Sequence, residues 1–331
     1  MKKKSTTLKT VDELVEGWTG ESGSNQHLGA IRDLVRYLSG ELYEQYQPFG
    51  GKALFWERLA RWLQNLDTKR DQQSLLEMVP WLLFIGLKEM EAMYQAAFVG
   101  PISRWLIDEA KLDITAAELP ARLQDELRTT FFGSIAGMDI NGFARINGLA
   151  GQSDRPNFRE LSRLGHFSKF KREFVKNGYK RIVAVEDMVG TGTQMEEATP
   201  ILAHMSPHKV LLCPIIVAPA GVERWHQELQ LSFGNLAFDP LFVIPQNATI
   251  PKQRGPQSEP SEIQRFREVL RNTWRQVRGR NPSPQVRSAF GYGEFGSLVL
   301  SFLNCPDNVP PLIHYEGDQW HALFPRLSRE G

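Results

Sequence analysis

A short stretch near the middle of the chain restricts its fold more than any other part. The apolar run 181–185 is rich in β-branched residues and leads into two adjacent acids, Glu186 and Asp187. A loop of glycine and threonine follows, and residues 194–204 then have a composition typical of a helix. A strand, a short loop and a helix in this order are typical of the repeating unit of a parallel α/β sheet.

The same alternation continues downstream. Residues 210–217 are continuously apolar, which suits a strand buried on both faces of a parallel sheet, and they are followed by a predicted helix at 222–231 and a strand at 241–244. Residues 131–135 and 297–303 are predicted as further strands. The fold class we expect is therefore α/β, with a parallel-sheet core and right-handed crossovers.

The N-terminal part has a different pattern. Between residue 9 and about residue 130, apolar side chains recur at three- and four-residue spacings, which indicates helices. We therefore predict a helical N-terminal cap over residues 1–130 and an α/β domain over 131–331. The polar, proline- and glycine-rich segment 246–260 marks the start of an insertion in that domain at about 246–290.

Composition excludes some classes of protein. The 331 residues are 41% hydrophobic and carry a formal net charge of +1, so bulk charge predicts no attraction to nucleic acid or membrane. The apolar runs 78–87 and 210–222 are shorter than the ~18 residues that span a bilayer. No apolar stretch follows the N-terminal lysines, so we expect no secretory signal and a cytoplasmic location. The two cysteines, Cys213 and Cys305, are expected to be buried free thiols.

The central loop has the residue types that bind a phosphorylated sugar. Glycines at 190 and 192 allow close approach of the backbone, and threonines at 191 and 193 add hydroxyl donors. The positive end of the following helix favours an anion. The adjacent carboxylates of Glu186 and Asp187 can accept hydrogen bonds from vicinal hydroxyls or hold a divalent metal. The segment matches neither a Walker A loop nor a dinucleotide-binding Gly-x-Gly-x-x-Gly loop.

This segment resembles the phosphoribosyl-pyrophosphate (PRPP) loop of type I phosphoribosyltransferases, in which a strand runs into two acids and then Thr-Gly-x-Thr. The resemblance implies that Glu186 and Asp187 hold the 2′- and 3′-hydroxyls of ribose. It also implies that Mg²⁺ accompanies PRPP or a nucleotide, with Asp187 as a candidate ligand of the metal. Gln194 stands where the family usually has threonine. The implied 5′-phosphate cradle consists of Met188, Val189, Gly190, Thr191, Gly192, Thr193 and Gln194.

Two other sequence elements of that family are harder to identify in this chain. A pyrophosphate-binding loop is expected after an earlier strand, and residues 131–137 are the candidate, although no basic residue accompanies them. A mobile basic loop is expected before the PRPP strand. Arg155, Arg159 and Arg163 lie in that region, where a solvated helix face explains them equally well.

The helical N-terminus and the proline-rich C-terminal segment are unlike those of nucleotide-salvage enzymes. Together they resemble the divergent phosphoribosyltransferase-like proteins encoded in prokaryotic conflict and retron defence operons. That narrower resemblance implies an antiviral effector that acts on nucleotides. It also implies a winged-helix protein, or a reverse transcriptase with its nucleic acid, as partner. Self-association into a homo-oligomer is left open.

Two functions follow as alternatives. The first is an enzyme that acts on PRPP or a nucleotide by phosphoribosyl transfer, N-glycosidic cleavage or pyrophosphorolysis. The second is a non-catalytic module that senses a nucleotide and works with a partner. The acid pair favours the first, and the missing pyrophosphate loop favours the second.

The predicted helix 261–280 carries an arginine stripe that bears on nucleic-acid binding. Arg267, Arg271, Arg275 and Arg278 recur at helical spacing beside an apolar stripe. A phosphate-facing surface is one interpretation. We favour the other, a solvated face whose arginine stems cover the apolar edge.

Overall fold

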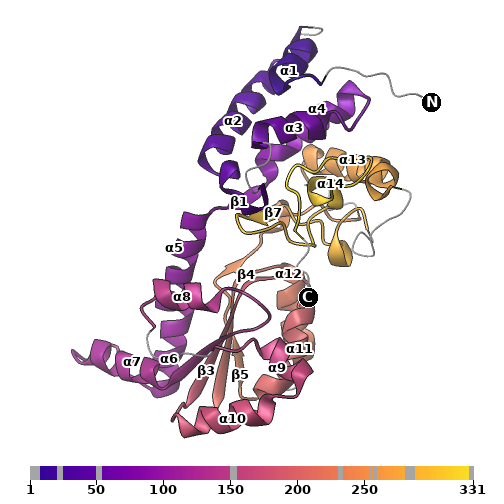
Figure 1. Ribbon diagram of the computed structural model, residues 1–331. Coiled ribbons are helices and arrows are strands. Elements are labelled where there is room, and N and C mark those ends of the chain that lie inside the picture. The colour runs from indigo at the N-terminus through magenta and orange to yellow at the C-terminus, as the bar shows by residue number, and fades with distance from the viewer. Residues whose placement is uncertain are drawn as a thin grey trace. The chain divides into compact units, whose positions relative to one another are not determined.

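The computed structural model describes most of the chain and divides it into two compact units (Figure 1). One unit comprises residues 88–245, and the other comprises 1–87 together with 246–331. The described residues are 8–20, 25–49, 54–149, 155–229, 234–253, 255, 259–279 and 288–327.

The unit of residues 88–245 is built on a parallel sheet. Its strands are β2 (Thr130–Ser134), β3 (Arg181–Val189), β4 (Lys209–Val217), β5 (Leu236–Phe238) and β6 (Phe242–Val243). The order is β2-β3-β4-β5, and β6 pairs with the last residues of β4. Every pairing among these strands is parallel. The expected mixed α/β fold with a parallel sheet is confirmed.

Helices cover both faces of this sheet (Figure 1). The helices of the unit are α5 (Leu87–Ala97), α6 (Ser103–Ala110), α7 (Leu119–Arg128), α8 (Ile140–Ile146), α9 (Phe158–Leu164), α10 (Phe167–Lys176), α11 (Thr193–Ala203) and α12 (Pro219–Arg224). On one face, Ile182 and Ala184 of β3 belong to a buried cluster with side chains of α9, α10 and α11. On the other, Phe143 of α8 contacts Phe132 of β2 and Tyr94 of α5. The sheet is therefore buried on both sides, as its apolar strands require.

The second unit is mainly helical and joins the two ends of the chain. Its helices are α1 (Val11–Thr19), α2 (His27–Glu41), α3 (Phe55–Leu63), α4 (Lys69–Met78), α13 (Ser261–Arg278) and α14 (Pro311–His314). Two short strands, β1 (Leu83–Ile85) and β7 (Val299–Ser301), form a parallel pair. The indoles of Trp62 and Trp320 both donate to the carbonyl of Leu312, at 2.7 and 2.8 Å. Residues from both ends of the chain thus share one core.

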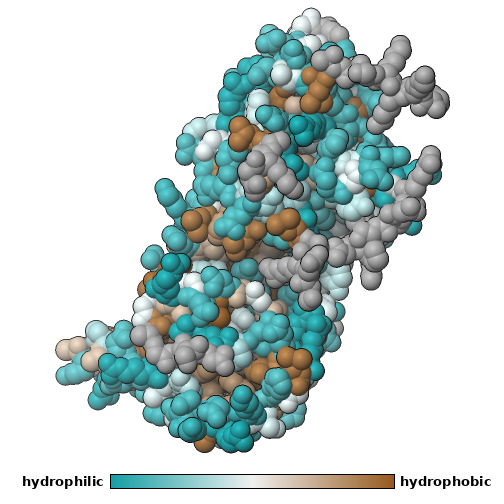
Figure 2. All heavy atoms as spheres, viewed as in Figure 1, coloured by the Kyte–Doolittle hydropathy of each residue, from teal (hydrophilic) through white to brown (hydrophobic). Residues whose placement is uncertain are grey.

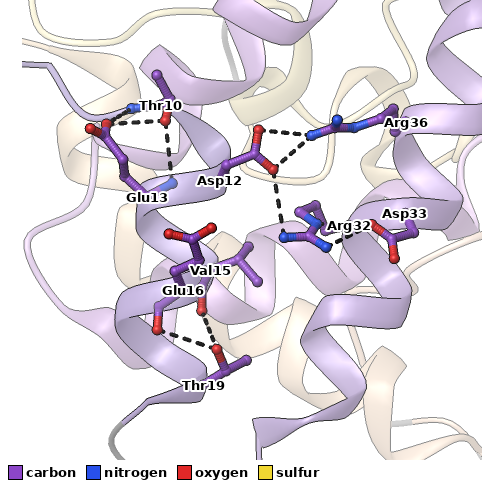
Figure 3. Close-up of polar contacts among 9 residues, drawn as sticks. All are labelled: Thr10, Asp12, Glu13, Val15, Glu16, Thr19, Arg32, Asp33 and Arg36. Atoms are coloured by element: carbon purple, nitrogen blue, oxygen red, sulfur yellow. Dashed lines mark hydrogen bonds and ion pairs between the residues drawn. The ribbon is translucent and has the colours of Figure 1, made fainter.

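Local sequence signals explain how the first helices begin and pack (Figure 3). Thr10 caps α1, because its hydroxyl accepts the amide of Glu13 while the Glu13 carboxylate accepts the amide of Thr10. Asp12 then pairs with Arg36 at 2.7 Å and with Arg32 at 3.6 Å, which links α1 to α2. These ion pairs are partly exposed, so each contributes only about 0–1 kcal/mol.

The two units divide the chain at points other than residue 130/131. Helices α5, α6 and α7 lie in the same unit as the parallel sheet, and residues 246–331 lie with the N-terminal helices. The strand predicted at 297–303 forms, but it pairs with β1 and not with the large sheet. Strands β1 and β7 are more than 200 residues apart in the chain. No local pattern in the sequence predicts which distant strand a segment will pair with.

The surface in view is mainly hydrophilic, with hydrophobic residues in separate groups (Figure 2). Scattered apolar side chains of this kind are ordinary on folded proteins. Among the residues that the structure describes, no helix combines the length and the apolar character needed to cross a bilayer.

Candidate phosphate-binding site

The candidate site lies where β2, β3 and β4 end at the same edge of the parallel sheet. The three strands run in register, with Ser134 beside Val185 and Glu186 beside Pro214. Ligands of open parallel sheets bind at the carboxyl ends of strands. Strand β3 continues to Val189, four residues beyond the predicted end, so the two acids are part of the strand.

The loop between β3 and α11 leads directly into the N-terminus of that helix. Gly192 is the N-cap of α11 and has a φ of +84°, a conformation that favours glycine. The hydroxyls of Thr191 and Thr193 lie 3.1 Å apart. The first hydrogen bond of the helix joins the Glu196 amide to the Gly192 carbonyl. The amides of the first turn before Glu196 have no acceptor within the helix and point toward its positive end.

Arg224 brings a positive charge to this loop. It is the last residue of α12, which follows the neighbouring strand β4. Its Nη1 lies 3.2 Å from the Thr193 hydroxyl and 3.3 Å from a carboxylate oxygen of Glu196. No motif in the sequence indicates this residue. Strand order could have indicated it. Helix α12 follows β4, the neighbour of β3, so it begins at the same edge of the sheet as the loop after β3.

Gly221 explains how α12 comes so close to the loop. A Cβ atom at this position would lie 2.8 Å from the carbonyl oxygen of Gly190 and 3.0 Å from a methyl group of Val217. Only a residue without a side chain allows that approach. The contact therefore fixes the backbone of the loop against the helix that carries Arg224.

The two acids lie in different environments. The Glu186 side chain is buried, at 2% exposure, and its Oε2 accepts the amides of Ala136 and Gly137 at 2.6 and 3.2 Å. Asp187 is half-buried, and its Oδ1 accepts the amide of Met188 at 2.8 Å. Successive residues of a strand point to opposite faces. Glu186 is therefore on the face of α9 to α11, and Asp187 is on the face of α5 and α8.

Tyr94 of α5 is a second residue that the sequence did not indicate. Its side chain is buried, and burial raises the pKa of its phenol, with the nearby charges of Asp187, Asp139 and Glu186 adding to the rise. The phenol is therefore protonated at neutral pH and keeps its O–H donor. It lies on the same face of the sheet as Asp187.

The three arginines proposed for pyrophosphate binding have partners elsewhere. Arg159 and Arg163 of α9 contact the carboxylate of Glu197 at 2.5 and 2.9 Å, and the hydrogen bond from Arg159 is the main cause that lowers the pKa of Glu197. Arg155 donates to the carbonyl of Leu149 at 3.0 Å and to Asn141 at 3.3 Å. Their part in pyrophosphate binding stays a prediction.

The two cysteines and the acidic and histidine side chains of the chain bear on redox and metal chemistry. Cys213 and Cys305 are free and buried, as expected, and burial raises the pKa of both thiols. Within the described ranges, no three or more side chains of His, Cys, Asp or Glu are grouped so that they could hold a metal ion.

The chain is similar to two curated proteins and matches one family model. Two curated relatives, DEAD-box ATP-dependent RNA helicases 15 and 56 of Arabidopsis thaliana, are each 24% identical over 164 residues. The match covers 44% of this chain, which spans only 38% of the length of each helicase. No solved structure matches significantly. The model of the family PRTase-CE matches residues 59–326, which is most of the chain. The chain therefore belongs to the phosphoribosyltransferase-like PRTase-CE family.

Proposed function

We propose that the chain binds PRPP or a nucleotide at the carboxyl edge of the sheet and transfers or cleaves at the anomeric carbon of its ribose. One observation carries the proposal. Two threonine hydroxyls, the positive end of α11 and the guanidinium of Arg224 meet at the loop that follows β3, the strand that carries Asp187. Hydroxyl, amide and guanidinium donors at a helix N-terminus suit a phosphate group, and a carboxylate beside them suits the hydroxyls of the attached sugar.

Each part of the ligand has its own partner in this proposal. The 5′-phosphate accepts hydrogen bonds from Thr191, Thr193 and the first-turn amides of α11, and Arg224 offsets its charge. Asp187 accepts hydrogen bonds from the ribose hydroxyls and holds the ring still. Its negative charge also stabilises the positive charge that develops on the sugar as the bond at C1′ breaks.

Mg²⁺ is part of this proposal, held by Asp187 together with the phosphates of the ligand. Mg²⁺ in proteins is usually held by one or two carboxylates and by substrate phosphates, and Asp187 supplies one such carboxylate here. The bound ion would offset the charge of the departing pyrophosphate. That role belongs to phosphoribosyl transfer from PRPP. In N-glycosidic cleavage water attacks C1′ and the base leaves, and in pyrophosphorolysis pyrophosphate attacks C1′ and the base leaves, so these reactions share the phosphate loop and Asp187 but not the departing pyrophosphate.

A non-catalytic sensor is the second candidate, and the position of Glu186 favours it. The amides of the loop after β2 are already bonded to this carboxylate, and that loop is the candidate for binding pyrophosphate. Incubation with Mg²⁺ and PRPP or a panel of nucleotides, followed by chromatography, separates the two functions. A released base or pyrophosphate supports the enzyme, whereas binding without turnover supports the sensor.

Replacement of Arg224 with methionine tests the phosphate site. We expect the variant to bind ribose 5-phosphate roughly tenfold more weakly, because a charge-assisted hydrogen bond to the phosphate is lost. Isothermal titration calorimetry measures the change. Arg172→Met removes an exposed arginine of α10 and serves as the matched control, with unchanged affinity. Equal affinity of the Arg224→Met variant and the wild type would remove Arg224 from the site.

The narrower resemblance to defence proteins leads to a further part of the proposal. As an effector that acts on nucleotides, the chain would deplete them when it is expressed without its restraining partner, a winged-helix protein or a reverse transcriptase with nucleic acid. The support for this part of the proposal is the resemblance of the helical N-terminus and the proline-rich C-terminal segment to such proteins. Chromatography of nucleotide pools in expressing bacteria tests it, because an effector lowers the pools and a passive binding protein does not.

A further inference from the structure

The loop between β2 and α8 binds an anion that belongs to the chain itself. The consecutive amides of Ala136 and Gly137 converge on a single oxygen, the Oε2 of Glu186, at 2.6 and 3.2 Å. The Glu186 side chain is only 2% exposed. A buried carboxylate must be compensated by hydrogen bonds, and these two amides provide that compensation.

The loop between β2 and α8 is held in this orientation by contacts with the segment at the start of α9. The Asn157 side-chain amide donates to the carbonyl of Ala136, and the Arg159 amide donates to the carbonyl of Ile135 at 3.0 Å. The Ser134 amide donates to the carbonyl of Pro156. The loop carbonyls therefore bind the segment that begins α9, and the amides of Ala136 and Gly137 are directed to Glu186.

Two converging backbone amides make a small anion-binding site. Successive N–H groups that point at one position create a fixed positive potential, and proteins use such pairs for phosphate groups and oxyanions. In this chain the position is occupied by a carboxylate oxygen. A phosphate oxygen is likewise an anionic hydrogen-bond acceptor, so it can accept from the same two amides.

We propose that Glu186 is an internal plug, whose carboxylate occupies the amide pair of Ala136 and Gly137 until a second phosphate group of the ligand displaces it. The inference rests on the proposed function, because that function brings a phosphorylated ligand to this edge of the sheet. The two acids then have separate tasks: Asp187 binds the sugar, while Glu186 competes with the phosphate. The competition lowers the affinity of the chain for compounds such as pyrophosphate.

Calorimetric titration of inorganic pyrophosphate into the full-length protein tests the plug. Glu186→Ala removes the competitor, so we expect affinity to rise by about tenfold or more, the contribution of one charge-assisted hydrogen bond. Glu186→Gln keeps an acceptor for the amides but removes the charge, so affinity rises by a smaller factor. Glu173→Gln, a partly exposed position on α10, is the control for loss of one negative charge and leaves affinity unchanged.

Hydrogen exchange of the peptide 131–143 provides a second measurement. In Glu186→Ala we expect faster exchange at the two amides, and pyrophosphate restores their protection. Unchanged or weaker pyrophosphate binding in the folded variants would overturn the plug. If the Glu186→Ala variant does not fold, the affinity of the Glu186→Gln variant is the result that tests the proposal. Failure of the proposed function is seen separately, as an absence of ribose 5-phosphate binding at the Arg224 loop in the wild type.

Discussion

Replacement of Asp187 with alanine is expected to weaken binding of PRPP by about ten- to a hundredfold, because hydrogen bonds from ligand hydroxyls to a carboxylate contribute roughly 1.5–3 kcal/mol. Asp187 is half-buried near the end of β3, and its Oδ1 accepts the neighbouring amide of Met188. We expect the variant to keep its fold. Calorimetry with PRPP and Mg²⁺ measures binding, and circular dichroism checks the fold.

Glu197→Gln is the matched control for this experiment. Glu197 is a carboxylate of the same unit, but it contacts Arg159 and Arg163 and lies outside the loop. We expect its loss to change PRPP affinity little, and any change in activity to be far smaller than for Asp187. If the two variants bind PRPP equally well, the assignment of the sugar-binding residue is wrong.

The largest effect on stability is expected at a buried ion pair in the helical unit. Arg267 of α13 and Glu259 are both nearly inaccessible, with side-chain exposures of 4% and 6%. Two hydrogen bonds join them, and the Nε of Arg267 also donates to the carbonyl of Pro251 at 2.6 Å. Removal of one partner leaves an uncompensated buried charge, so Glu259→Gln or Arg267→Met should lower the free energy of unfolding by about 3–5 kcal/mol.

A double variant distinguishes destabilisation by an unpaired buried charge from a simple loss of packing. When both charges are removed, in Arg267→Met with Glu259→Gln, no unpaired charge is left, and the loss should be clearly smaller than the sum of the single losses. Arg275→Met changes an exposed arginine of the same helix and should alter stability by no more than about 0.5 kcal/mol. Denaturation with urea measures all four variants. Additive losses in the double variant would contradict the interpretation.

This ion pair also shows what periodicity cannot report. The sequence places Arg267 in one stripe with Arg271, Arg275 and Arg278, and a solvated face is the favoured interpretation. For Arg267 that interpretation is wrong, because the residue is buried against Glu259. Arg271 donates to the carbonyl of Lys252, which also lies outside the helix. Helical spacing identifies the face of a helix but not the loop that covers it.

The parts of the fold that the sequence predicted have local signals. The strand, loop and helix of 181–204 were recognisable from an apolar run, a glycine pair and a helical composition. The helix predicted at 222–231 begins three residues earlier, where Pro219 occupies its first turn. Strand β5, only three residues long, was missed because so short a run has no readable periodicity.

The parts that the sequence did not predict depend on contacts between distant segments. Arg224 reaches the loop from a different crossover, 31 residues after Thr193. The burial of Glu186 depends on amides 50 and 49 residues earlier in the chain. In the sequence, Glu186 and Asp187 are an adjacent pair of acids, and only strand geometry separates them onto two faces of the sheet.

The pairing of β1 with β7 has a consequence for how the chain folds during synthesis. Residues 88–245 form a continuous unit, so this unit can complete its sheet as soon as it has left the ribosome. The helical unit cannot, because Trp62 needs the carbonyl of Leu312 and Leu83 to Ile85 need Val299 to Ser301. We therefore expect helices α1 to α4 to complete their core only after the last strand is made, so that their apolar surface is exposed for longer during synthesis than that of the other unit.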